Sequence, residues 1–431
     1  MHATRDDLAK RVAGSRLEIP WVQLGIGVVC MACVASLQYG WTLFVNPIDT
    51  KYHWGRSAIQ VAFTLFVVVE TSLVPVEGYV VDRFGPKWVV LGGGILVGLS
   101  WMINSVAGSL AVLYVAAMLG GVGAGCVYGT CVGNALKWFP GRRGVAAGLT
   151  AAGFGAGAAL TIVPISHVIA SAGYEQAFWV FGLVQGGIVF ALAWLLLPPP
   201  PHLLATAAKP SQSAHGYTPG EVLKSPVFYV LYLMFVLIAA GGLTMTASMA
   251  PIAKDLKIDS VPVKLLGFTM PALVFALSLN RIIDGVGRPF FGWLSDRMGR
   301  EHTMALAFLI GAAALFTLNR CGTRPVVFVL VTALYFGAFG EIFSLFPATQ
   351  GDIFGSKFAA ANAGLLYTAK GVGSLLVAPA AAIAQTFGWS VVFTLAMCLN
   401  VSAAFLALLV LKPMRMLHVA QSRETFNLSN D

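Results

Sequence analysis

Twelve apolar runs of about 20 residues constrain the fold of this chain more than any other feature. A helix of that length crosses the ~30 Å hydrocarbon core of a bilayer and satisfies its own backbone hydrogen bonds there. Only 10% of the 431 residues are charged, against about 25% in soluble proteins. We therefore predict an all-α membrane protein with twelve transmembrane helices. The predicted spans are residues 21–45, 57–80, 88–108, 111–136, 145–170, 177–197, 227–252, 265–293, 303–319, 325–349, 359–384 and 389–411.

The spans fall into two groups of six, separated by a polar, proline-rich stretch. We expect residues 1–197 to form an N-terminal six-helix half, residues 198–226 a flexible linker, residues 227–411 a C-terminal half, and residues 412–431 a tail. With these boundaries, 17 of the 27 Lys and Arg lie on the side of the termini and the linker, 7 on the other side and 3 inside the membrane. The richer side is cytoplasmic by the positive-inside rule, so we expect both termini inside.

One motif is repeated at matched positions of the two halves, with an offset of 214 residues. The repeated residues are Gly78, Asp82 and Arg83 after the second span, and Gly292, Asp296 and Arg297 after the eighth. Glycine lets neighbouring helices approach closely, and aspartate pairs with basic residues or caps a helix end. We predict a conformational latch at the cytoplasmic helix ends. A parallel repeat of two six-helix halves is typical of one class of secondary transporters.

Three basic residues lie deep inside predicted spans: Arg281 and Arg288 in the eighth, and Lys370 in the eleventh. A charge at that depth costs at least ~2.5–3.5 kcal/mol on insertion scales and usually marks a substrate or ion pathway. A carboxylate leaving water needs its solvation replaced, and a planar guanidinium offers it paired hydrogen bonds. The pattern therefore predicts a carrier for small anions.

Acidic residues accompany these cations. Arg281, Asp284 and Arg288 have the spacing i, i+3, i+7 and share one helix face. If Lys370 and Glu70 share a cavity with this stripe, its formal charge is +1. That charge suits a monocarboxylate, or a dicarboxylate accompanied by one proton.

Two further acids lie inside the apolar runs. Glu77 is close to Asp82 and is predicted to belong to the latch. Glu341 is two residues from both Phe339 and Phe343, which places it on the opposite helix face. We do not expect Glu341 to contact substrate.

The chain resembles the major facilitator superfamily over nearly its whole length and, more narrowly, the bacterial oxalate:formate antiporter family. The resemblance is carried by QYGWTLFVNP at 38–47, AFTL at 62–65, VYGTCVGNALKWFP at 127–140, GRPF at 287–290 and AK at 369–370. It implies that Arg288 and Lys370 embrace the substrate, with polar or aromatic lining from Gln38, Tyr39 and Tyr128. Tyr367 stands where the oxalate carrier has tryptophan, and Phe339 and Phe343 occupy two further aromatic positions.

Two transport modes remain open. The first is an anion exchanger for oxalate- or formate-type carboxylates. The alternative is a proton-coupled symporter for lactate- or pyruvate-type monocarboxylates. Asp284, four residues before the Arg288-Pro pair, resembles the pattern in the eighth span of the proton-coupled monocarboxylate transporter family. Asp284 or Glu70 would carry the proton, and Arg281 would share the charge balance. The lysine typical of that family's first span is missing here.

Other classes of function lack support in the sequence. There is no G-x-x-x-x-G-K-[ST] loop and no cluster with metal-ligand spacing, so we expect neither an enzyme nor a cofactor nor a metal. The net charge of +9 is spread over short turns rather than a basic stripe, which argues against nucleic-acid binding. The expected partners are a small carboxylate and the lipid bilayer, and the expected form is a monomer in the bacterial inner membrane.

Overall fold

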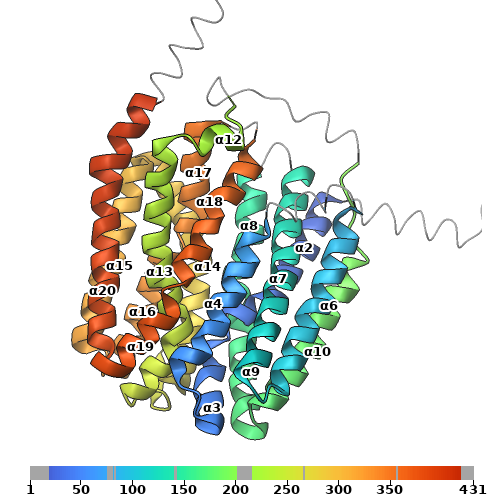
Figure 1. The fold of residues 1–431 in the computed structure, drawn as a ribbon, viewed down its shortest axis with the longest axis vertical. Helices are drawn as coiled ribbons and strands as arrows, with labels where there is room; N and C mark the ends of the chain where they lie inside the picture. Colours follow the sequence, from blue (N-terminus) through green and yellow to red (C-terminus); the bar gives the residue numbers. More distant parts are fainter. Residues whose placement is uncertain are drawn as a thin grey trace, which may run out of the picture.

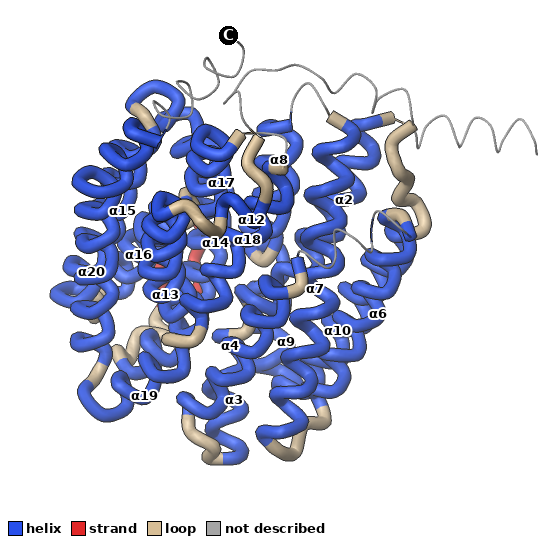
Figure 2. Tube along the Cα trace, turned by 45° about the horizontal axis from the view of Figure 1, so that its top comes forward, coloured by secondary structure: helices blue, strands red, loops and turns tan. Residues whose placement is uncertain are grey.

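The computed structural model describes residues 19–74, 81, 84–139, 143–200, 216–265, 267–355 and 358–418. Helices account for nearly all of these ranges (Figures 1 and 2). The first half contains α2 (Pro20–Tyr39), α3 (Thr42–Tyr52), α4 (Arg56–Ser72), α6 (Pro86–Ser105), α7 (Leu110–Trp138), α8 (Arg143–Gly157), α9 (Ala159–Ala172) and α10 (Tyr174–Ala193).

The second half contains the remaining helices and the two strands. Its elements are α12 (Pro219–Val222), α13 (Pro226–Asp255), β1 (Pro262–Leu265), β2 (Phe268–Pro271), α14 (Ala272–Met298), α15 (Arg300–Cys321), α16 (Pro325–Phe339), α17 (Ile342–Phe354), α18 (Ala359–Ser374), α19 (Val377–Phe387), α20 (Trp389–Phe405) and the π-helical turn η1 (Leu406–Leu411). Residues 201–215 of the predicted linker lie outside the described part of the chain.

The predicted all-α membrane fold with twelve spans is confirmed. Ten helical segments of the described chain are long and apolar enough to cross a membrane. The other two spans are α4, whose described part has 17 residues, and α14, which has 27 residues and carries the charges of Arg281, Asp284 and Arg288. The eighth span begins at Ala272 rather than at residue 265, because residues 262–271 form an antiparallel hairpin.

Within the described residues, four of the spans are broken into two helices near their middle. The breaks lie at Gly40–Trp41, Ala158, residues 340–341 and residues 375–376. A proline follows each break within the second helix, and proline removes a backbone donor and clashes with the preceding turn. Irregular backbone at membrane depth is tolerated where it is buried in protein, as it is in many transporters.

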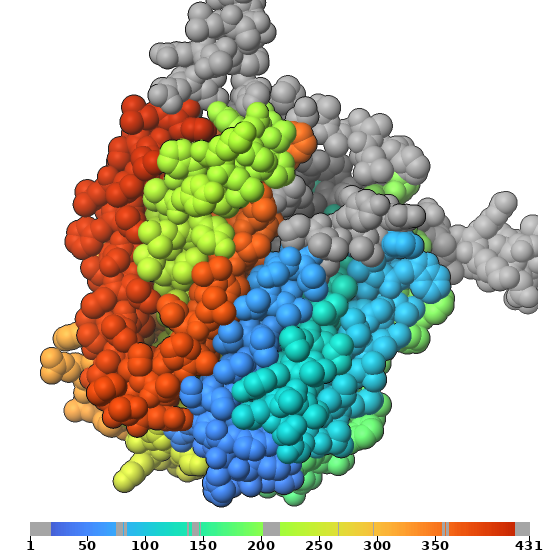
Figure 3. All heavy atoms as spheres, viewed as in Figure 1, coloured from blue at the N-terminus to red at the C-terminus, as the bar shows by residue number. Residues whose placement is uncertain are grey.

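The two halves lie side by side and meet along one long seam (Figures 1 and 3). Across the seam, α4 packs against α18 and α19, α14 packs against α8 and α9, and α13 packs against α3. We call the side where α2 begins and where α12 lies the linker side; the ends of α3 and α13 lie on the opposite side. Glu70, Arg281, Asp284, Arg288 and Lys370, which are all buried, come from helices at this seam.

Candidate functional site

The three basic residues singled out from the sequence are buried at the seam between the halves. Arg281 and Arg288 on α14 are 2% and 3% exposed, and Lys370 on α18 is 1% exposed. All three belong to the second half, yet each contacts a side chain or a carbonyl of the first half. Any ligand that binds these cations therefore acts on the contact between the halves.

Arg288 forms hydrogen bonds within α14 and across the seam. Its Nη2 lies 3.0 Å from Asp284 Oδ2 and 3.4 Å from the Tyr39 hydroxyl oxygen, and its Nη1 donates to the carbonyl of Ala151 at 2.9 Å. Gly155 of α8 makes room for the guanidinium, because a Cβ there would lie 2.9 Å from Arg288 Cζ. The close approach of the α8 backbone to the guanidinium thus positions this arginine.

Arg281 shares the same carboxylate one turn earlier on α14. Its Nη1 lies 3.5 Å from Asp284 Oδ2. The guanidinium is also sandwiched by two aromatic rings, with Cζ 4.2 Å from the centroid of Tyr39 and 4.3 Å from that of Phe336. Cation–π contacts of this kind partly replace lost hydration. One carboxylate therefore serves two arginines.

Lys370 forms a second cluster that bridges the halves. Its Nζ lies 2.8 Å from Glu70 Oε2, 3.0 Å from Gln38 Oε1 and 3.2 Å from the Tyr367 hydroxyl oxygen. An ammonium group has three donors, so these acceptors match its capacity. Glu70 and Lys370 are each 1% exposed.

Aromatic rings separate and enclose the two clusters. The centroid of Phe343 lies 4.5 Å from Arg288 Cζ and 5.9 Å from Lys370 Nζ. Tyr128 stacks on Tyr367 with centroids 5.6 Å apart, and Phe154 packs edge-on against Tyr128 at 5.3 Å. Phe154 also packs against Tyr39. The result is an aromatic box in which Phe343 lies close to both cation clusters.

The structure thus brings together all nine residues predicted for binding and charge balance. These are Arg288, Lys370, Gln38, Tyr39, Tyr128, Tyr367, Asp284, Glu70 and Arg281. Sequence reasoning missed Phe154, Phe336 and the Ala151 carbonyl. The only signal for Phe154 was its place in a run of glycines at 153–157, where close helix packing was to be expected.

Several polar atoms of the site have no hydrogen-bond partner among the described protein atoms. They are Gln38 Nε2, Glu70 Oε1, Arg281 Nη1, Asp284 Oδ1 and Arg288 Nε. Buried polar atoms of native proteins are nearly always paired, so such a group is typical of a ligand-binding or proton-binding site. By formal charge the three cations exceed Glu70 and Asp284 by one.

The other intramembrane acid, Glu341, lies at the break between α16 and α17. It is fully buried, and both its carboxylate oxygens lack a hydrogen-bond partner among the described residues. Its neighbour Gly340 faces the site instead: a Cβ there would clash with Asp284 Oδ1. Glycine is therefore required at this position for Asp284 to reach the arginines.

The predicted latch is described only in part. Gly78, Asp82 and Arg83, with Glu77, lie outside the described residues, as does the side chain of Asp296. Gly292 faces open space, and the Arg297 guanidinium lies 4.3 Å from the centroid of Trp293.

A nearby ion pair holds helices of the second half together on the linker side. Arg300 Nε lies 3.0 Å from Asp352 Oδ2, and Arg300 also bonds to Ser295. This pair connects α15, α17 and α14 within one half.

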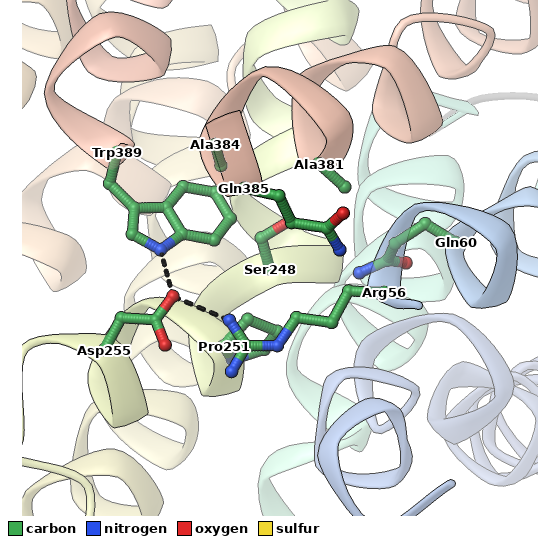
Figure 4. A pocket seen from close by; sticks show the side chains of 9 residues that line it. All are labelled: Arg56, Gln60, Ser248, Pro251, Asp255, Ala381, Ala384, Gln385 and Trp389. Carbon is green, nitrogen blue, oxygen red and sulfur yellow. Dashed lines mark hydrogen bonds and ion pairs between the residues drawn. The ribbon is translucent and has the colours of Figure 1, made fainter. Parts of the chain in front are cut away.

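A different set of contacts ties the halves together on the opposite side. Arg56 Nη1 lies 2.6 Å from Asp255 Oδ2, and Trp389 Nε1 donates to the same oxygen at 2.8 Å (Figure 4). Gln60 Nε2 donates to the carbonyl of Ala247 at 2.7 Å. We call Arg56, Gln60, Asp255 and Trp389 the far-side clasp. Since these residues come from both halves, the clasp closes the opposite side of the seam.

Two helical halves with charged side chains buried at their interface define a multi-pass membrane transporter. The chain belongs to the Major Facilitator Superfamily, whose sequence profile matches residues 28–288 and 273–426. This match confirms the family resemblance that the motifs of the sequence indicated.

Individual relatives agree with this membership. The oxalate:formate antiporter of Oxalobacter formigenes is 33% identical over 91% of this chain and 92% of its own length. A probable sulfoacetate transporter of Cupriavidus necator is 24% identical over 74% of this chain and 76% of its own. Human monocarboxylate transporter 11 is 27% identical over 65% of this chain and 57% of its own.

Proposed function

We propose that this protein is a secondary active transporter that exchanges small carboxylates by alternating access. The observation that carries the proposal is the pair of buried cations, Arg288 and Lys370, which flank one aromatic ring, Phe343, and reach across the seam to the first half. Three relatives are named for the transport of oxalate and formate, of sulfoacetate and of monocarboxylates. All of these are small organic anions with a carboxylate group, which supports small carboxylates as the substrate class.

In the proposed complex, a carboxylate binds beside Phe343 and accepts from Arg288, whose Nε has no partner within the described chain. Its second oxygen replaces Gln38 or Tyr367 as an acceptor for Lys370. Charge-assisted bonds to a guanidinium are about twice as strong as neutral ones. Because Arg288 and Lys370 also bind the first half, the carboxylate changes which contacts hold the seam closed.

The charge of the site supports exchange as the transport mode. An excess of one cation in a buried site is costly when uncompensated. A bound monoanion removes that excess, so the loaded carrier reorients more easily than the empty one. Proton-coupled symport is the second candidate. It is favoured by the contact of Asp284 with both arginines, since an incoming anion that displaces Asp284 would let it take up a proton.

We further propose that the protein lies in the plasma membrane of a bacterium, with the linker side in the cytoplasm. The 17 Lys and Arg that the sequence places on this side support the orientation. The repeated motif with Gly78, Asp82 and Arg83, and Gly292, Asp296 and Arg297, would then act as a latch at the cytoplasmic ends of the helices.

The proposal is tested with purified protein in liposomes preloaded with unlabelled oxalate, formate or lactate, or left empty. We expect uptake of labelled carboxylate only into preloaded vesicles, with no dependence on an inward proton gradient. Uptake into empty vesicles that requires the gradient would establish symport instead. Absence of carboxylate uptake under every condition would refute the substrate class.

Weakening the far-side clasp should favour opening of the seam on the side where the clasp lies, away from the linker side. Asp255→Asn removes the ion pair with Arg56; because the Asp255 side chain is 40% exposed, the pair is worth ~0.5–1 kcal/mol, which corresponds to a factor of about 2–5 in the closed-to-open ratio. The readout is the thiol-labelling rate of Ser248→Cys, because Ser248 is buried and lines the pocket of the clasp (Figure 4).

A matched control for this experiment is Glu175→Gln. Glu175 pairs with Lys51 at 2.7 Å, but both residues belong to the first half. We expect its labelling rate at Ser248→Cys to equal that of the parent. An Asp255→Asn variant that labels no faster than this control would show that the clasp does not hold the seam closed.

Added volume at Gly155 should weaken carboxylate binding by about 10-fold, because one lost or bent charge-assisted bond is worth ~1.5 kcal/mol. In Gly155→Ala the new Cβ would approach Arg288 Cζ to 2.9 Å, so the guanidinium must move away from Asp284 and Ala151. Gly148→Ala on the same helix is the control, since its Cβ meets nothing within 4 Å. Equal carboxylate affinity of the two variants, measured by competition, would contradict this role of Gly155.

A further inference from the structure

We propose that Glu70 is the residue that selects substrates by charge: by pairing with Lys370, it restricts the site to carboxylates with a single negative charge. The inference rests on the proposed carboxylate transport and adds to it a specificity-determining residue and a substrate class, the small monoanions.

The first argument is that Lys370 already has its counter-ion. Glu70 Oε2 lies 2.8 Å from Lys370 Nζ, and each residue is 1% exposed, so water contributes little to the balance of either charge. Glu70 comes from α4 of the first half and Lys370 from α18 of the second. The pair is therefore neutral without any ligand.

The second argument is that the unbalanced charge lies at the arginines. Asp284 forms ion pairs with both Arg281 and Arg288, at 3.5 and 3.0 Å, and only the second is also a hydrogen bond. Two guanidinium groups with one such carboxylate keep one positive charge. Arg288 also has its Nε free of protein partners within the described chain. One carboxylate group of a ligand is enough to neutralise this cluster.

A second negative charge has no counterpart among the described residues of the site. A dianion that placed its other carboxylate at Lys370, in place of Gln38 or Tyr367, would bring a second negative charge to a cation that Glu70 already neutralises, so that one of the two carboxylates would be a buried acid without a counter-ion. Burial of an unpaired charge is among the most costly changes in a protein, and such a group is expected to take up a proton instead. The dianion is thus disfavoured unless a proton accompanies it.

Oxalate and oxamate test the idea because they have nearly the same size and shape but carry two and one negative charges at neutral pH. The measurement is the concentration of each that halves uptake of labelled formate into preloaded liposomes. We expect the parent protein to bind oxamate at least ~10-fold more tightly than oxalate, because bound oxalate would bring one buried charge without a counter-ion. Preference for oxalate in the parent would overturn the inference while leaving carboxylate transport established; inhibition by neither, with no formate uptake, would refute the proposed function itself.

The decisive variant is Glu70→Gln, which keeps the side-chain shape and leaves the Lys370 charge unmatched. We expect the oxalate-to-oxamate affinity ratio to rise at least ~10-fold. Glu70→Asp retains the charge and should retain the preference of the parent. Glu341→Gln is the matched control, because Glu341 is a buried acid with no bond to the cations within the described chain, and its ratio should not change.

A variant that transports too little for competition is still informative through its thermal stability. In the parent protein oxamate should raise the unfolding temperature more than oxalate does, and in Glu70→Gln this difference should shrink or reverse. An unchanged difference would overturn the inference.

Discussion

Transport should fall ~100-fold when Arg288 is replaced by glutamine. The guanidinium offers the substrate a charge-assisted hydrogen bond from Nε together with its positive charge; such a bond is worth about 1.5–3 kcal/mol, and the upper value corresponds to a factor of about 100. The same change removes the bonds from Arg288 to Ala151 and Tyr39 of the first half. Exchange of labelled formate in liposomes measures the loss.

Arg288→Lys should be nearly as inactive, although it preserves the charge. An ammonium group is a point charge and lacks the planar set of donors through which the guanidinium binds a carboxylate and its protein partners at the same time. It also lacks the reach to bond Asp284, Ala151 and Tyr39 together. Arg320→Gln is the control, because Arg320 is an exposed arginine in the last turn of α15, where its guanidinium lies 5.5 Å from the centroid of the Phe316 ring. Exchange at the parental rate in Arg288→Lys, with equal protein in the liposomes, would remove Arg288 from the binding site.

The fold could be predicted from the sequence because apolar length alone determines which segments cross a bilayer. Charge inside an apolar run was also enough to identify Arg281, Arg288 and Lys370, since a charged side chain in hydrocarbon is costly and usually marks a substrate or ion pathway. Helical spacing then placed Asp284 beside both arginines, which is a local relation. These predictions depend on residues that are neighbours in sequence or on bulk properties of a segment.

Relations between distant segments could not be predicted in the same way. Glu70 and Lys370 are separated by 300 positions, and nothing in either segment specifies the other as its partner. The pairing of Arg56 with Asp255 in the far-side clasp could not be predicted for a related reason. Both residues lie at the ends of apolar runs, where charges ordinarily face the membrane surface. The breaks in four spans were missed as well, because the prolines that follow them are common in membrane helices.

Replacing Lys370 by methionine should destabilise the protein because it leaves Glu70 buried without a partner. Removal of one member of a buried ion pair typically costs ~3–5 kcal/mol. We expect the unfolding temperature in detergent to fall by at least ~5 °C. The second change Glu70→Gln, made in the same chain, removes the unpaired buried carboxylate. It should recover most of the lost unfolding temperature.

The double variant separates the structural role of the pair from its role in transport. Its stability should approach that of the parent, yet formate exchange should stay about 10-fold lower, because the ammonium donor to the substrate is absent and such a bond is worth ~1.5 kcal/mol or more. Full recovery of exchange would show that Lys370 serves only to balance Glu70. Failure to recover stability would show instead that the bonds from Lys370 to Gln38 and Tyr367 hold the seam as strongly as the ion pair does.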